Sequence, residues 1–241
     1  MKRPALLLPL LAACLTAIPP APAHAGDDDD LAELQAKIGN EWLLVKNDRL
    51  RNIKTWIKQE DGKRYRTFKV EATLDGGLRQ CVRTLLDVPG FSQWYWEVIE
   101  GRLLRKLSPT EYQIYLKHRA PYGIPDRDVA GILSFTPQTP DNRTLTVQVR
   151  AIPDLVPLAP PLIRLQAEDM TVRLTPVGIK RLRIEAEGYV DPGGRAPNWA
   201  FNMIQRSAPY SIVIGLQRVL ADPPAAETRS ALPFRVYEYG E

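Results

Sequence analysis

The residue types that most often carry out chemistry are few in this sequence, and they do not form a complete catalytic set. His118 is the only histidine outside the first 25 residues, and its neighbours Lys117 and Arg119 favour a solvated strand face. No histidine is then available to activate Ser207 or Ser211, and this inventory excludes a Ser-His-Asp triad. A single histidine is also too few for a usual metal-ligand set. The sequence therefore predicts a protein that is not an enzyme, with no catalytic residue and no metal site.

The usual motifs for cofactors are missing as well. The sequence has no Gly-rich phosphate-binding loop and no Cys-x-x-Cys pair, so we expect neither a nucleotide cofactor nor structural zinc. Cys81 lies on the apolar side of a predicted helix, which indicates a buried and unreactive thiol. The formal net charge of +4 comes without a basic tract, so nucleic acid is not an expected partner, whereas weak attraction to anionic headgroups is compatible with it.

A long apolar segment near the end of the chain is the most informative element. It runs over 196–220, after the turn Asp191-Pro192-Gly193-Gly194, and Pro209 is its only internal break. When the segment is wound as a helix, one face is apolar but mostly small, which leaves space above it. We expect this face to contact a hydrophobic ligand through Ala200, Met203, Ile204, Ser207, Ala208, Ser211 and Gly215. Close packing of the same small residues onto a sheet is the alternative.

Periodicity along the rest of the chain predicts an α+β fold. Apolar residues at helical spacing predict helices over 31–45, 77–87 and 91–96. Period-two alternation and the turn residues between segments predict strands near 53–57, 65–72, 97–107, 110–119, 127–136, 143–152, 165–175 and 179–190. A long antiparallel sheet must curl, and the C-terminal helix can lie in its concave face.

One loop, over 153–163, combines four prolines with mostly apolar side chains. Proline forbids regular strand pairing, and loops normally lie at the surface. We expect this loop to act as a gate over a cavity, or as a membrane-touching edge, through Leu155, Val156, Leu158, Leu162 and Ile163. The alternative is that the loop simply packs onto the fold.

The N-terminus has the pattern of an export signal. A basic start and a short apolar run lead to Ala23-His24-Ala25, which predicts a signal peptide over 1–25 and a periplasmic or secreted protein. The alternative is a lipid-anchored protein, because Leu11-Ala12-Ala13-Cys14 resembles a bacterial lipobox. We expect one folded domain over 26–221, no membrane span within it, and a loosely ordered tail over 222–241.

The order of these elements, together with several short blocks, resembles the START lipid-binding family of the helix-grip superfamily. The similarity covers roughly residues 35–222. The matching blocks are Glu41-Trp42, Phe68-Lys69-Val70-Glu71-Ala72, Tyr115-Leu116-Lys117-His118-Arg119-Ala120-Pro121, Asp126-Arg127-Asp128, and Asp191 to Trp199 with Asn202. The resemblance implies a curved antiparallel sheet wrapped around the C-terminal helix, with one lipid held in a tunnel between them. The export signal and the proline-rich loop depart from the better-known members.

This resemblance implies a lipid-binding or lipid-transfer protein without catalytic machinery, which acts as a monomer in transient contact with membranes. Sterol, hopanoid, phospholipid and fatty acid all suit such a tunnel. Arg127 and Asp128 match a recurring pair of the family, and the resemblance gives them contact with a lipid headgroup or hydroxyl. The alternative is a structural ion pair that orders the loop before the strand. A cyclase- or aromatase-like enzyme and a ligand-free interaction module are the other functions that this fold permits.

Overall fold

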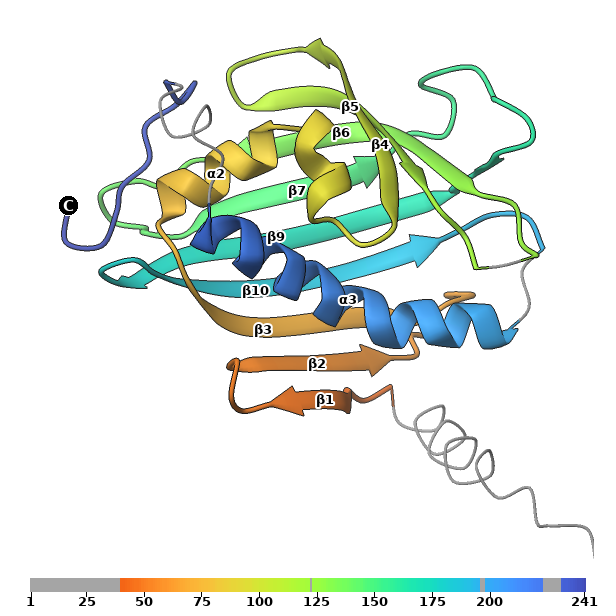
Figure 1. Cartoon of the computed structure of the whole chain (residues 1–241), viewed down its shortest axis with the longest axis horizontal. Helices are drawn as coiled ribbons and strands as arrows, with labels where there is room; N and C mark the ends of the chain where they lie inside the picture. Colours follow the sequence, from red (N-terminus) through yellow and green to blue (C-terminus); the bar gives the residue numbers. More distant parts are fainter. Residues whose placement is uncertain (1–39, 122, 196–197, 223–230) are drawn as a thin grey trace, which may run out of the picture. The chain divides into compact units, whose positions relative to one another are not determined.

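The computed structural model describes residues 40–121, 123–195, 198–222 and 231–241, in which ten strands form one curved sheet (Figure 1). The strands are β1 (Leu43–Asp48), β2 (Ile53–Lys58), β3 (Thr67–Asp75), β4 (Val98–Lys106), β5 (Glu111–His118), β6 (Arg127–Thr136), β7 (Leu145–Ala151), β8 (Ile163–Arg164), β9 (Ala167–Gly178) and β10 (Arg181–Asp191). Their order is β1-β2-β3-β10-β9-β7-β6-β5-β4, and β8 pairs with β6. All pairs are antiparallel except β6 with β8.

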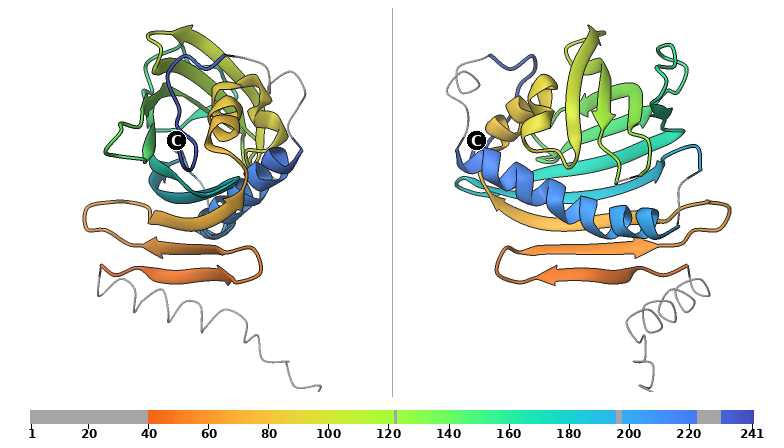
Figure 2. Two further views of the ribbon diagram at one scale, coloured as in Figure 1. Left: turned by 90° about the vertical axis from the view of Figure 1, so that its left-hand side faces the viewer. Right: turned by 45° about the vertical axis from the view of Figure 1, so that its right-hand side comes forward.

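Within the part of the chain that the structure describes, three helical segments lie on one side of this sheet (Figure 2). They are α2 (Leu78–Leu86), the 3₁₀ helix η1 (Pro89–Gln93) and α3 (Asn198–Ala221). The long helix α3 contacts strands β2 and β3 and helix α2. The predicted α+β architecture, a curved antiparallel sheet with a long C-terminal helix, is confirmed.

Alternating burial explains why the strand segments were recognisable in the sequence. In β2, Ile53, Thr55 and Ile57 are buried, and Lys54 between them is exposed. In α2, apolar residues at helical spacing place Leu78, Cys81 and Val82 in the core, where burial raises the pKa of the Cys81 thiol to about 12. Cys81 is therefore buried, as predicted, and its thiol is held in the protonated, unreactive form.

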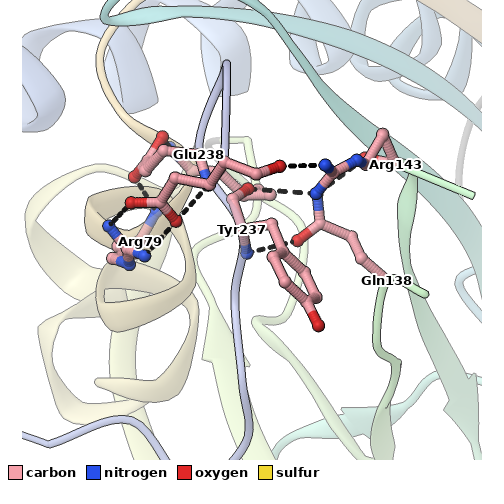
Figure 3. A network of polar contacts seen from close by, with 7 residues as sticks. Arg79, Gln138, Arg143, Tyr237 and Glu238 are labelled. Atoms are coloured by element: carbon pink, nitrogen blue, oxygen red, sulfur yellow. Dashed lines mark hydrogen bonds and ion pairs between the residues drawn. The ribbon is translucent and has the colours of Figure 1, made fainter. Parts of the chain in front are cut away.

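The last described residues, 231–241, are packed onto the fold (Figure 3). Val236 is buried in the main core, and the amide of Gln138 exchanges two hydrogen bonds with the backbone of Tyr237. Glu238 accepts hydrogen bonds from the backbone N–H groups of Leu78 and Arg79 at 3.0 and 2.8 Å. These N–H groups have no partner within their own helix, so Glu238 serves as the N-terminal cap of α2. The expectation of a loose tail is wrong for these residues, because capping and core packing fix them.

Two other expectations about the fold need correction. Residues 31–39 of the helix predicted over 31–45 lie outside the described residues, but Val45 belongs to strand β1, so a helix that reaches this residue is wrong. Val45 continues the helical spacing of the residues before it, but the pairing of β1 with β2 places it in a strand. The two-residue strand β8 was not predicted, because it is too short to show any period.

Candidate functional site

A cavity lies between the sheet and the first half of α3. It encloses about 130 Å³, close to the roughly 150 Å³ of an engineered apolar cavity that holds benzene. Its walls come from β3, the segment after η1, the β5–β6 loop, β9, β10 and α3. Most of the lining is apolar, as in cavities that bind hydrophobic molecules.

Small residues shape this space at two places. On α3, Ala200 and Ala208 line the cavity with single methyl groups. On β10, Gly188 pairs with Phe68 on one side and with Met170 on the other, and both of these side chains line the cavity. A Cβ atom at Gly188 would lie 2.5 Å from the Phe68 ring and 2.7 Å from Met170. Because Gly188 has no side chain, the Phe68 and Met170 side chains can approach each other over β10.

The structure separates the predicted ligand-contacting residues into two groups. Arg127, Ala200, Ile204 and Ala208 line the cavity. The others do not line it: Met203 and Ser207 are exposed, Asp128 is buried, and Ser211 and Gly215 border an adjoining surface depression that shares Tyr95, Trp96 and Arg119 with the cavity. The face of α3 that lines the cavity also includes Gln205, Pro209 and Ile212, whereas Ser207 is exposed.

Gly215 has a packing role that the sequence left as an alternative. A Cβ atom there would lie 2.0 Å from the backbone oxygen of Trp94. The glycine therefore allows α3 to touch the segment that follows η1. At Gly215 the small residue allows close packing, whereas Ala208 borders the cavity.

A buried ion pair lies directly behind the cavity wall. Arg164 on β8 forms two hydrogen bonds of 2.9 Å with the carboxylate of Asp128 on β6, and both side chains are almost fully buried. The carboxylate raises the pKa of Arg164. A structural ion pair is therefore present at Asp128, but its partner is Arg164, so the alternative of a pair between Arg127 and Asp128 is wrong. Arg127 instead donates a hydrogen bond to the backbone oxygen of Pro125, and burial lowers its pKa.

The same arginine fastens the proline-rich loop. The guanidinium of Arg164 donates hydrogen bonds to the backbone oxygens of Pro153, Val156 and Pro157. None of the five predicted gate residues lines the cavity. The tethered loop lies beside the β5–β6 loop instead, so the five residues do not border the cavity in this structure. Ala120, Pro121 and Ile124 of the β5–β6 loop do line the cavity.

Three polar side chains that the sequence analysis did not assign to the site meet at the cavity: Tyr95 after η1, His118 on β5 and Glu168 on β9. The Tyr95 hydroxyl donates a hydrogen bond to Glu168 Oε1 at 3.2 Å, and its ring packs edge-on against His118. Burial raises the pKa of Glu168 to about 7, although the bond from Tyr95 opposes this shift. Burial also lowers the pKa of His118 to about 4, against a hydrogen bond with the Trp96 backbone. The expected solvated face at His118 is wrong, because the half-buried ring lines the cavity and its Nε2 atom is buried.

Two further findings concern the described residues as a whole. No three His, Cys, Asp or Glu side chains come together there in a way that could hold a metal ion. Within the same residues, no helix has both the length and the apolar character needed to cross a bilayer.

No protein-family profile matches this sequence, and no curated protein matches it. Solved structures match it well. The STAR-related lipid transfer protein of Xanthomonas axonopodis aligns with a TM-score of 0.68 and 26% identity, over 75% of this chain and 99% of that chain. Human STARD10 aligns with a TM-score of 0.66 and 20% identity, over 86% and 84%. Human StAR-related lipid transfer protein 5 aligns with a TM-score of 0.61 and 15% identity, over 82% and 96%.

The curved sheet, the C-terminal helix and these alignments define a helix-grip protein. More specifically, the chain belongs to the START/helix-grip superfamily, as the sequence blocks predicted.

Proposed function

We propose that this protein binds one hydrophobic ligand in the cavity beneath α3 and transfers it between membranes. The observation that carries the proposal is the mainly apolar cavity, placed between the sheet and the C-terminal helix of a START-type fold. Burial of apolar surface, at about 25 cal/mol per Å², supplies the affinity. A cavity of about 130 Å³ holds only part of a lipid, so binding a whole lipid requires the walls to move apart.

We further propose that the β5–β6 loop opens to admit the ligand and that the neighbouring proline-rich loop touches the membrane. Pro121 and Ile124 border the cavity, and the backbone N–H of Ile124 bonds the oxygen of Pro121 within the same loop. The proline-rich loop lies against Pro125 and Asp126, and its Leu158 side chain is 69% exposed. A membrane-bound leucine at this position would bring the opening close to the bilayer.

The proposal includes export to the periplasm, which rests on the residue pattern over 1–25. The mass of the protein isolated from a bacterial host tests it. Cleavage after Ala25 leaves Gly26 as the first residue, whereas lipoprotein processing leaves a lipid-modified Cys14.

The direct test is to extract the purified protein with organic solvent and to identify bound material by mass spectrometry. It is paired with two substitutions on the same helix. Ala208→Phe places a ring in the cavity and should lower ligand occupancy at least about tenfold, whereas Ser207→Phe places the same ring in solvent and should leave occupancy unchanged. Equal occupancy in both variants would show that the ligand lies elsewhere.

An enzyme of the cyclase or aromatase type is the second candidate. Perturbed pKa values in a cavity are typical of catalytic acids and bases, and Glu168 and His118 provide such a pair. Recovery of an unchanged ligand after incubation supports transfer, and recovery of a chemically altered ligand supports catalysis. An empty extract and no lipid binding in solution support a ligand-free interaction module.

A further inference from the structure

Two buried polar atoms on the cavity wall have no hydrogen-bond partner among the described residues. They are Glu168 Oε2 and His118 Nε2, and both residues line the cavity. Glu168 as a whole is only 3% exposed. Folded proteins rarely leave such atoms unpaired, because each has lost its bonds to water without a replacement. A bound molecule that reaches both residues can supply the missing bonds.

The protonation of the two groups defines what they offer. The hydrogen bond with the Trp96 backbone raises the pKa of His118, so the ring donates this bond through Nδ1. In the neutral ring, Nε2 is then an acceptor. Glu168 Oε1 is already occupied by the Tyr95 hydroxyl. Because burial brings its pKa to about 7, Glu168 Oε2 can carry a hydrogen or accept one near neutral pH.

These properties select among ligand chemistries. A cationic headgroup would pair with Glu168 but would share the cavity with Arg66, Arg119 and Arg127. An anionic headgroup would be drawn to those arginines and would leave Glu168 and His118 unpaired. A hydroxyl group both donates and accepts, so it can bond His118 Nε2 or either protonation state of Glu168.

We infer that the ligand is a hydrophobic alcohol whose hydroxyl group is bound by the polar cluster of Tyr95, His118 and Glu168. The apolar body of the ligand then lies along Phe68, Met170 and the inner face of α3. This inference rests on the proposed function and narrows the ligand class within it.

The test compares matched pairs of probes that differ only at the hydroxyl. The probes are 1-hexadecanol and hexadecyl methyl ether, and cholesterol and its 3-methyl ether. Binding is followed by tryptophan fluorescence, since Trp96 lines the cavity. In at least one pair, the alcohol should bind the unmodified protein at least about tenfold more tightly than its ether.

Substitutions in the polar cluster test whether it causes the preference for the alcohol over the ether. In Glu168→Leu, and independently in His118→Phe, the preference should fall to about twofold or less while the ether binds as before. Glu187→Leu is the control, because Glu187 is exposed on β10 and does not line the cavity. Melting curves establish that each variant is folded, and either cluster variant suffices if the other unfolds.

The outcomes separate this inference from the function on which it rests. Equal binding of alcohol and ether to the unmodified protein would overturn the inference and leave lipid binding intact. The same holds if the preference survives in the cluster variants, or if the ligand extracted from the protein has no free hydroxyl. Failure of all four probes to bind, with an empty extract, would overturn both.

Discussion

The two halves of α3 use small residues for opposite purposes. In the first half, Ala200 and Ala208 border the cavity. In the second half, Val213, Leu216 and Leu220 are buried in the main core, and Gly215 brings the helix against the Trp94 backbone. A small side chain therefore borders empty space where no other element packs against the helix. Where another backbone lies opposite, the small side chain lets that backbone come close. The residue type alone does not distinguish the two.

The two ends of the fold are also held together differently. The packed end has α2, η1 and the C-terminal segment 231–241 around α3, and apolar contacts fill the interior. The cavity end lacks that filling, and its wall is fixed instead by the buried pair of Asp128 and Arg164. At the end of the fold that contains the cavity, the buried ion pair of Asp128 and Arg164 thus holds the wall without a bound ligand. We call this ion pair the clamp.

The largest effect on stability is expected when this clamp is broken. Arg164→Met leaves the Asp128 carboxylate buried without a positive charge beside it and frees three loop carbonyls, so unfolding should become about 3–5 kcal/mol easier. Denaturant titration measures it. The control is Glu100→Gln, which breaks an exposed ion pair with Arg102 and should cost about 0–1 kcal/mol. Similar small losses in both variants would contradict the clamp.

The polar cluster of the cavity end should make the stability of the protein depend on pH between about 4.5 and 7. The pKa of Glu168 is raised from 4.5 to about 7, chiefly by burial. Between these values the unfolded chain has lost this proton and the folded chain keeps it, so Glu168 lowers stability as the pH rises through the range. Relative to Glu168→Gln, the unmodified protein should lose about 3 kcal/mol between pH 4.5 and 7.

His118 should act in the opposite direction. Its pKa is lowered from 6.5 to about 4, chiefly by burial, so its contribution is lost as the pH falls through that range. The two effects offset each other in the unmodified protein between about pH 4.5 and 6.5. Stability curves of Glu168→Gln should therefore fall toward acid pH, and those of His118→Asn should rise. Two flat curves would show that neither group is buried as described.

We expect a methyl group added at the packed end to lower the stability of the protein more than an aromatic ring added at the cavity end. Gly215→Ala places a Cβ atom against a backbone oxygen that cannot rotate away, so we expect a loss of about 1–3 kcal/mol despite the better helix propensity of alanine. Ala208→Phe, which extends into free volume, should cost less than Gly215→Ala. The ranking is measured by thermal unfolding of both variants, and the reverse order would contradict the comparison.

Much of this arrangement was readable from the sequence, and the missed parts have identifiable causes. Local period fixed the strands β2 to β7, β9 and β10 and the helices α2 and α3 to within a few residues. The period-two alternation of the strands also indicated that two residues missed as site residues, Glu168 and His118, face the interior. Glu168 is in phase with Met170 and Val172 on β9, and His118 is in phase with Ile114 and Leu116 on β5. Charged neighbours had suggested solvent for His118, whereas strand phase points it inward.

Other features depend on contacts that no local pattern records. Nothing in the local sequence distinguishes Arg164 from an exposed charged residue beside an apolar loop. Its ion pair with Asp128 depends on the two-residue pairing of β8 with β6. Glu238 caps a helix that begins 160 positions earlier in the chain. The rotation of α3, which turns Ser207 outward, is set by the elements packed against it. Long-range packing decides these points, so the sequence alone could not.

The smallest effect on stability is expected in the proline-rich loop beside the cavity end. Leu158 is 69% exposed and does not line the cavity, so Leu158→Asp should change unfolding by about 0.5 kcal/mol or less and leave ligand affinity unaltered. If this loop touches the membrane, binding to phosphatidylglycerol-containing vesicles should weaken about tenfold, because an apolar contact is replaced by a charge that such lipids repel. Leu50→Asp is the matched control, since Leu50 is 92% exposed in the turn between β1 and β2. Vesicle sedimentation that shows equal losses in the two variants would indicate general charge repulsion and remove the proline-rich loop from the membrane contact.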